Sequence, residues 1–101
     1  MIYLPFQFQL FNQTWHVRAA RQHEITDLGL CNPDELEIII NNQNPESMTH
    51  TLTHEIVHAI EQKLQLELTE RQVDLLSLGL IDLIRSNILI FDYINKEENE
   101  Q

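Results

Sequence analysis

The sequence predicts an α+β fold, in which an N-terminal β-hairpin and a third strand pack against two helices. Three segments in the first forty residues have the pattern of strands, namely Phe6–Leu10, Thr14–Arg18 and Leu36–Ile40. The later residues 48–66 and 69–86 instead show apolar side chains at helical spacing. A chain of 101 residues without an internal repeat can form one hydrophobic core but hardly two.

The hairpin is predicted because its two segments alternate apolar and polar side chains around a turn at Asn12-Gln13. Four aromatic side chains belong to this region, and we expect them in the core: Phe6, Phe8, Phe11 and Trp15. Residues 21–32 are read as a polar connection with turn signals. The strand at 36–40 therefore begins after a break.

The two helices carry recognisable start signals. Asn44 is a candidate N-cap, followed by Pro45 at the first helical position and Glu46 in the first turn. Thr69 and Gln72 form a capping box before the second helix. The predicted buried stripe of the first helix is Leu52, Ile56, Ala59, Ile60 and Leu64, and that of the second is Val73, Leu76, Leu80, Leu83 and Ile84.

The C-terminal part of the chain is less defined. The apolar run Ile88–Ile94 fits a final strand or a further helix equally well, because periodicity does not separate short apolar strands from helices. We expect residues 95–101 to be a charged, disordered tail and residues 1–94 to form one domain.

The most specific motif is the run His54-Glu55-Ile56-Val57-His58, an H-E-x-x-H pattern in the first helix. Residues four apart are neighbours on a helix face, so His54 and His58 can reach one metal ion together. Glu55 lies beside them and can accept a proton from a water molecule on that ion. The pattern is typical of zinc hydrolases and predicts Zn²⁺ binding by both histidines, with Glu55 as general base.

A third metal ligand is expected downstream, because a catalytic zinc site normally has three protein ligands. No histidine follows His58, so the candidates are carboxylates. Glu70, in the first turn of the second helix, is the leading candidate. Asp74 lies one turn later on the same face and can orient a ligating imidazole. Glu61 and Glu67 are the alternative ligands.

These residues resemble a known family. The strand Leu36–Ile40, the H-E-x-x-H helix and the Glu70-x-x-x-Asp74 helix together look like a minimal gluzincin-type metallopeptidase. The chain is similar in particular to small zincin-like proteins of phages and mobile elements, including the ImmA/IrrE-type metallopeptidases. The resemblance covers residues 36–87, about half of the chain.

The resemblance implies a role for each matching residue. By position, His54, His58 and Glu70 would bind zinc and Glu55 would be the general base. The strand before the motif helix would bind an extended peptide by edge pairing, which points to Leu36–Asn41.

The residue that would stabilise an oxyanion is left open. Candidates are Tyr3, Tyr93, His23 and His50, which the sequence does not rank. His50 stands one turn before the motif, too far along the helix to share an ion with both motif histidines, and we expect it at the rim of the site.

Composition limits the partners and the compartment. A net charge of −10 with only six Lys and Arg argues against nucleic acid as a ligand. Cys31 is the single cysteine, no segment has the length and apolar character of a membrane span, and the N-terminus lacks the basic residues of a signal peptide. We therefore expect a cytoplasmic protein without a membrane partner.

Three functions fit the sequence. The leading hypothesis is a zinc-dependent metallopeptidase that acts on a peptide or protein substrate. The second is a metal-binding interaction module with little or no turnover, which binds a host or repressor protein. The third is a helical domain in which the motif is coincidental. Substrate identity and oligomeric state are not encoded in any spacing of this sequence.

Overall fold

The computed structural model describes residues 4–99 and has an α+β fold in which four strands precede three helices. The elements are β1 (Phe6–Leu10), β2 (Gln13–Ala19), β3 (Gly29–Asn32), β4 (Glu37–Ile40), α1 (Pro45–Leu64), α2 (Glu70–Ser86) and α3 (Ile88–Asn99). This confirms the predicted fold class.

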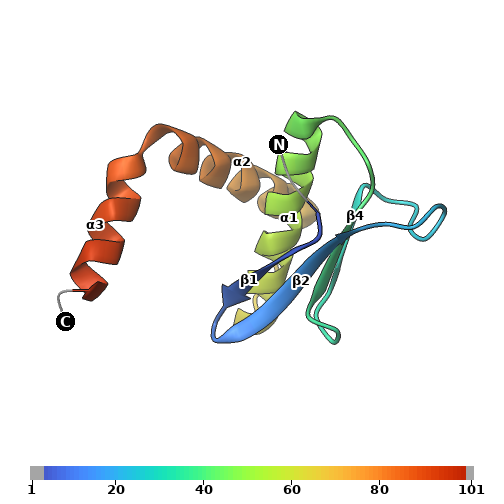
Figure 1. The fold of residues 1–101 in the computed structure, drawn as a ribbon, viewed down its shortest axis with the longest axis horizontal. Coiled ribbons are helices and arrows are strands. Elements are labelled where there is room, and N and C mark those ends of the chain that lie inside the picture. Colours follow the sequence, from blue (N-terminus) through green and yellow to red (C-terminus); the bar gives the residue numbers. More distant parts are fainter. Residues whose placement is uncertain (1–3, 100–101) are drawn as a thin grey trace.

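The four strands form one mixed sheet in the order β1-β2-β4-β3. The outer pairs β1–β2 and β4–β3 are antiparallel, and the central pair β2–β4 is parallel. Helix α1 packs across one face of this sheet, and α2 packs on α1 (Figure 1). The sheet therefore supports α1, and α1 in turn supports α2.

The core lies between the sheet and α1. Its fully buried members come from β2, β4 and α1, and they include Val17, Ile38, Ile40 and Ala59. Trp15 stacks on Phe8 with ring centroids 6.2 Å apart, which joins the two strands of the hairpin. The predicted hairpin is thus confirmed, although its turn lies one residue earlier, at Phe11 and Asn12, where both φ angles are positive.

Both helix starts follow the predicted capping signals. The Asn44 side chain accepts a hydrogen bond from the Ser47 amide at 2.9 Å, and Pro45 begins α1. Thr69 and Gln72 exchange the two reciprocal hydrogen bonds of a capping box at the start of α2. Each cap satisfies amide groups that have no partner within the helix.

One strand was missed by the sequence analysis. Residues 29–32, taken as polar connection, form β3 and pair with β4 from Gly29↔Ile40 to Asn32↔Glu37. As a result β4 is paired on both sides, with β2 and with β3. The prediction that Leu36–Asn41 offers a peptide-binding edge is therefore wrong, because its backbone groups are already used within the sheet.

The buried stripes of both helices also differ from the prediction. In α1, Val57 is buried, whereas Leu64 at the helix end is exposed. In α2, Val73 is fully buried as predicted, and so is Ser77, whose hydroxyl donates to the Val73 carbonyl. Two other predicted members of the α2 stripe, Leu76 and Leu83, are exposed because only one side of α2 lies on α1. Ile84 is exposed as well, near the end of the helix, although it lies on the same side as Val73.

The C-terminal segment is a helix. The run Ile88–Ile94, left open between strand and helix, belongs to α3, which packs against α2. The helix extends to Asn99, so most of the segment 95–101 predicted as a disordered tail has helical backbone, and Glu100 and Gln101 lie outside the described residues. None of the helices in the described part of the chain combines the length and apolar character required to cross a bilayer.

An ion-pair cluster fixes the loop after β2. The Arg18 guanidinium donates to Glu37 on the neighbouring strand at 2.9 Å and to Glu24 in the loop at 2.6 Å. The Arg18 hydrogen bond, together with the Arg21 amide, lowers the pKa of Glu24 to about 2. The loop that leads towards β3 is thereby tied to the central strands.

The Arg18 cluster predicts a pH-dependent contribution to stability. A lowered folded-state pKa means that the Glu24 contribution is complete above its unfolded value of 4.5 and disappears as the pH falls towards about 2. We therefore expect Glu24→Gln to be less stable than the wild-type protein near neutral pH and equally stable at about pH 2. Urea unfolding at both pH values measures this difference, with Glu35→Gln as the exposed control. A difference that persists unchanged in acid would contradict the assignment.

Candidate metal centre

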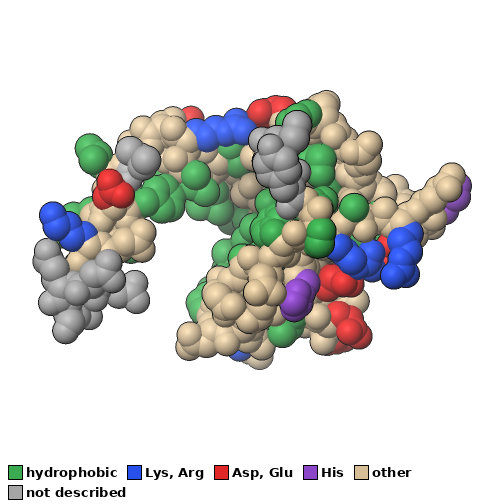
Figure 2. Space-filling model, in the orientation of Figure 1, with side chains coloured by type: hydrophobic (Ala, Val, Ile, Leu, Met, Phe, Trp, Pro, Cys, Tyr) green, Lys and Arg blue, Asp and Glu red, His purple; other side chains and the backbone are tan. Residues whose placement is uncertain are grey.

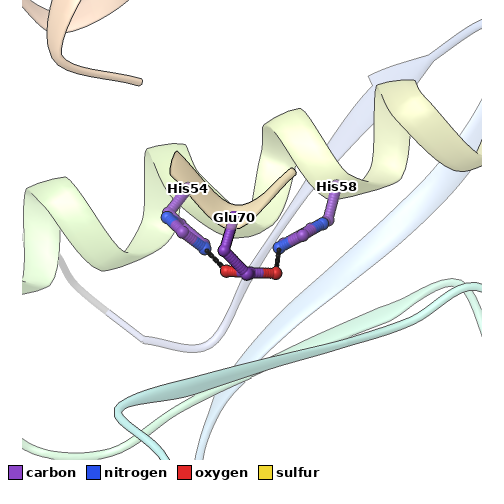
Figure 3. Close-up of side chains that lie close together, drawn as sticks. All are labelled: His54, His58 and Glu70. Carbon is purple, nitrogen blue, oxygen red and sulfur yellow. Dashed lines mark hydrogen bonds and ion pairs between the residues drawn. The ribbon is translucent and has the colours of Figure 1, made fainter. Parts of the chain in front are cut away.

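The two motif histidines lie on one face of α1, as their spacing predicts. Their rings are 4.9 Å apart between centroids and meet edge to face. In both, the Nε2 atom is turned away from the helix towards the same point (Figure 3). The helix therefore presents two imidazole nitrogens to one position in space.

Glu70 reaches that position from the first turn of α2. Its two carboxylate oxygens lie 3.1 Å from His54 Nε2 and 3.1 Å from His58 Nε2 (Figure 3). The Glu70 side chain is 76% exposed, so this side of the site faces solvent. The structure thus brings together all three ligands predicted from the sequence.

The donor atoms of this trio fit a zinc ion. One donor atom from each of the three side chains lies within 4.8 Å of the others. A tetrahedral zinc ion with bonds of 2.0–2.1 Å needs its ligand atoms about 3.3 Å apart, so only small side-chain movements are required. Two imidazoles and one carboxylate leave a fourth position free on a tetrahedral ion, as catalytic zinc sites do.

Glu61 supports His58 from the side opposite to the trio. Its carboxylate lies 3.0 Å from His58 Nδ1 and also accepts a hydrogen bond from the Leu68 amide at 2.7 Å. The Leu68 amide, followed by His58, lowers the pKa of Glu61. A carboxylate at Nδ1 holds the proton there and leaves Nε2 free to bind metal. The sequence analysis had considered Glu61 only as an alternative ligand.

Asp74 lies between His54 and a further histidine. Its Oδ1 atom is 3.6 Å from His54 Nδ1, close but beyond hydrogen-bond length, and 3.0 Å from His50 Nε2. The latter contact lacks hydrogen-bond alignment, so His50 Nε2 is buried without a partner among the described residues. Asp74 is therefore adjacent to the ligand that it was predicted to orient, and His50 lies at the rim of the site as expected.

Glu55 is buried beneath the metal-binding trio. The residue is only 8% exposed, and this burial raises the pKa of its carboxyl group, while the nearby imidazoles act in the opposite direction. Desolvation disfavours the charged carboxylate and makes it a stronger base. The location and environment of Glu55 suit the role of proton acceptor.

Gly29 on β3 allows the sheet to approach Glu55. A Cβ atom at this position would lie 2.6 Å from the Thr51 methyl carbon and 3.3 Å from Glu55 Oε2. A hydrogen-bonded chain holds this contact, because Thr51 donates to Gln43 and Gln43 donates to the Leu28 carbonyl. The missing side chain therefore sets the distance between β3 and the motif helix.

These elements enclose a cleft of about 610 Å³ that contains the three metal-binding side chains, Glu55, His50 and Asp74. Residues 27–31 form the opposite wall. The sequence analysis missed this wall because residues 21–32 contain no run of alternating side chains. The one available signal was Gly29, which can mark a close approach of backbone in a strand.

The structure distinguishes the candidates for oxyanion stabilisation by their positions relative to the cleft. His50 lines the cleft, whereas His23 is in the exposed loop after β2 and Tyr93 is on α3. Tyr3 lies outside the described residues. The lining residues of the cleft in the described part of the chain include no Tyr, Lys or Arg.

Comparison of the chain with protein-family models, with curated proteins and with solved structures finds no match. The assignment of function therefore depends on the geometry of this site.

The contact at Gly29 predicts that a second substitution restores the stability lost by a first one. Gly29→Ala should displace β3 or Glu55, because the new methyl group overlaps the Thr51 methyl group. We expect a loss of about 1–3 kcal/mol in the free energy of unfolding, typical of an overpacked site. Thr51→Ser removes that methyl group and keeps the hydroxyl, so the double variant should recover most of the loss. Urea unfolding of the two single variants and the double variant tests this. Additive losses would show that the contact is not the cause.

The Glu61 contact predicts an effect on metal affinity. In Glu61→Gln, the side chain can keep its bond to the Leu68 amide only by turning its NH₂ group towards His58 Nδ1. This geometry favours the proton on Nε2, the atom that should bind metal. We expect zinc affinity to fall about 10- to 100-fold, as measured by competition with a chelating dye.

Glu67→Gln is the matched control, because Glu67 is an exposed acid close to Glu61 in the chain. It changes the net charge equally and should leave zinc affinity unchanged. Equal losses in both variants would mean that general electrostatics, not the His58 contact, controls affinity.

Proposed function

We propose that this protein is a zinc-dependent metallopeptidase that hydrolyses a peptide bond with Glu55 as general base. The observation that carries the proposal is the convergence of His54, His58 and Glu70 from two helices, with a buried carboxylate beside them. The motif alone arises by chance in some helices. The motif together with a third candidate ligand on a separate helix is expected by chance far less often than the motif alone.

Each side chain has a definite task in this proposal. His54 and His58 bind the ion through Nε2, and Glu70 completes the set through a carboxylate oxygen. Glu61 keeps the His58 proton on Nδ1. Zinc bound there would act as a Lewis acid and lower the pKa of water from 15.7 to about 7.

Glu55 moves the proton in the reaction. Its carboxylate accepts a proton from water as the water oxygen forms a bond to the peptide carbonyl carbon. It then donates the same proton to the amide nitrogen as the carbon–nitrogen bond breaks. The products are a carboxylic acid and an amine, which become a carboxylate and an ammonium ion when the acid's proton passes to the amine. Burial supports this role because a raised pKa makes both transfers easier near neutral pH.

The substrate is proposed to bind along β3. Within residues 4–99 this strand pairs with β4 alone, so its outer edge has free backbone groups. The edge forms part of the cleft wall, and Gly29 brings it close to Glu55. An extended peptide added to β3 would pass the base and the metal-binding trio. This replaces the edge at Leu36–Asn41 that the sequence analysis favoured.

The alternative is a metal-binding interaction module with little or no turnover. One observation favours it: the described lining of the cleft includes no Tyr, Lys or Arg to stabilise an oxyanion, and a missing donor commonly costs about 3 kcal/mol of barrier. Such a protein would use the same cleft and strand to hold a peptide without cleaving it.

We place the protein in the cytoplasm. The support is its single cysteine, Cys31, which can form no disulfide within the chain. A reducing compartment suits such a chain.

Metal content and peptide cleavage together test the proposed function. Mass spectrometry of the purified protein should find close to one zinc per chain, lost in His58→Ala and Glu70→Ala and kept in Glu55→Gln. A library of unstructured peptides should be cleaved by the wild-type protein, and Glu55→Gln should reduce the rate at least about 100-fold.

Two outcomes would contradict parts of this proposal. Zinc without cleavage of any peptide, combined with peptide binding that persists in Glu55→Gln, would establish the interaction module instead. Absence of zinc after reconstitution would exclude both metal-dependent functions. Glu67→Ala serves as the control for loss of an acidic side chain outside the trio.

A further inference from the structure

Helices α2 and α3 carry an extended apolar surface that the rest of the described chain does not cover. Figure 2 shows hydrophobic side chains along the underside of α2, above a hollow between α3 and the hairpin. Leu76 is 50% exposed and Leu89 is 77% exposed. We call this surface the α2–α3 apolar face. It is formed from the exposed apolar side chains of the two helices, which are Leu75, Leu76, Leu78, Leu83, Ile84, Leu89, Ile90, Phe91, Tyr93 and Ile94.

The exposed area of the whole chain is larger than a compact fold of this size requires. A compact monomer of 12.0 kDa exposes about 6,000 Å². The structure exposes 7566 Å², an excess of about 1,600 Å². Its radius of gyration is 14.4 Å, whereas about 12.7 Å is typical of a compact chain of this length. The protein is thus too open for a monomer of its size.

Helix α3 accounts for much of this openness. It packs against α2 and stands clear of the sheet in Figure 1. Leu89 and Tyr93 are one turn apart, as are Ile90 and Ile94, so these four side chains form one apolar side of the helix. An isolated helix of 12 residues is marginal in water. A helix with this pattern gains its stability from burial of the apolar side.

We propose that the α2–α3 apolar face is the interface of a closed homodimer, in which α3 of each copy packs into the hollow beneath α2 of the other. A stable interface buries about 800 Å² per partner, and the excess exposed area of the whole chain, about 1,600 Å², is large enough to contain an interface of that size. A twofold axis would place α2 and α3 of both copies around one apolar core, as in a four-helix bundle. The same surface serves both sides, so no second kind of protein is needed.

The charge of the chain predicts how this dimer responds to salt. Each copy carries a net charge of −10, so two copies repel each other. Added salt screens this repulsion and should strengthen the dimer. A complex between this face and a basic protein would weaken with salt instead.

Sedimentation velocity of the full chain over a wide range of concentrations tests the proposal. The wild-type protein should have twice the mass of the 12.0 kDa chain, with a dissociation constant that decreases as salt increases. Leu76→Asp and Leu89→Asp should each raise that dissociation constant at least about 30-fold, because a buried unpaired charge is introduced at the interface. Leu28→Asp is the control, since Leu28 is an exposed leucine in the loop before β3.

Far-UV circular dichroism of each variant separates loss of the dimer from loss of the fold. Hydrogen exchange of the wild-type protein gives a second measurement, in which protection of α3 should increase with protein concentration.

A wild-type protein that is monomeric at all concentrations would overturn the proposal. So would a mass that keeps rising with concentration, or a dimer that both aspartate variants retain. These outcomes are read from mass and hydrogen exchange, without any measurement of zinc or of peptide cleavage, so failure of the dimer and failure of the proposed function are distinguishable.

Discussion

The structure depends on the short turn that joins α1 to α2, because this turn decides where Glu70 lies. Gln65 ends α1 in the left-handed conformation, and the Leu66 amide donates back to the Glu61 carbonyl. The Glu61 carboxylate then accepts from the Leu68 amide and also contacts His58. One side chain therefore shapes the turn and orients His58, a proposed metal ligand. Because both tasks involve the same carboxylate, the position of α2 and the geometry of the site are coupled.

A second constraint is the close approach of β3 to the motif helix. Burial of Glu55 raises its pKa and makes it a better base, but a buried carboxylate destabilises the fold. The close approach is possible because Gly29 has no side chain, and it is held by Gln43 and Thr51. The same approach brings the free edge of β3 to the cleft. Strand, base and metal-binding trio therefore form a single unit, although they are distant in sequence.

The sequence predicts the parts of this unit that depend on local spacing. The two imidazoles follow from the helical repeat, and the starts of α1 and α2 follow from capping residues whose hydrogen bonds involve neighbours in the chain. Glu70 was proposed as a ligand because the capping box places it in the first turn of the second helix. β3 was missed because four residues with a glycine at the first position carry no periodic signal. The role of Glu61 was missed because it depends on the path of a turn, which spacing on one helix does not determine.

The buried stripe of α2 was predicted only in part, and the reason explains why the α2–α3 apolar face is exposed. Its apolar positions extend further round the helix than α1 can cover, so Val73 and Ser77 are buried while Leu76 and Leu83 are not. Within one chain, α2 is thus held by a narrow contact of small side chains. A second copy covering the opposite side would enclose α2 between two apolar surfaces. A dimer contact that holds α2 in place would also hold Glu70 at the position where it is proposed to bind metal. By thermodynamic linkage, dimerisation would then raise the metal affinity, and metal binding would strengthen the dimer. In the proposed dimer, the α2–α3 apolar face would therefore help to hold Glu70 in position, in addition to the narrow contact between α2 and α1.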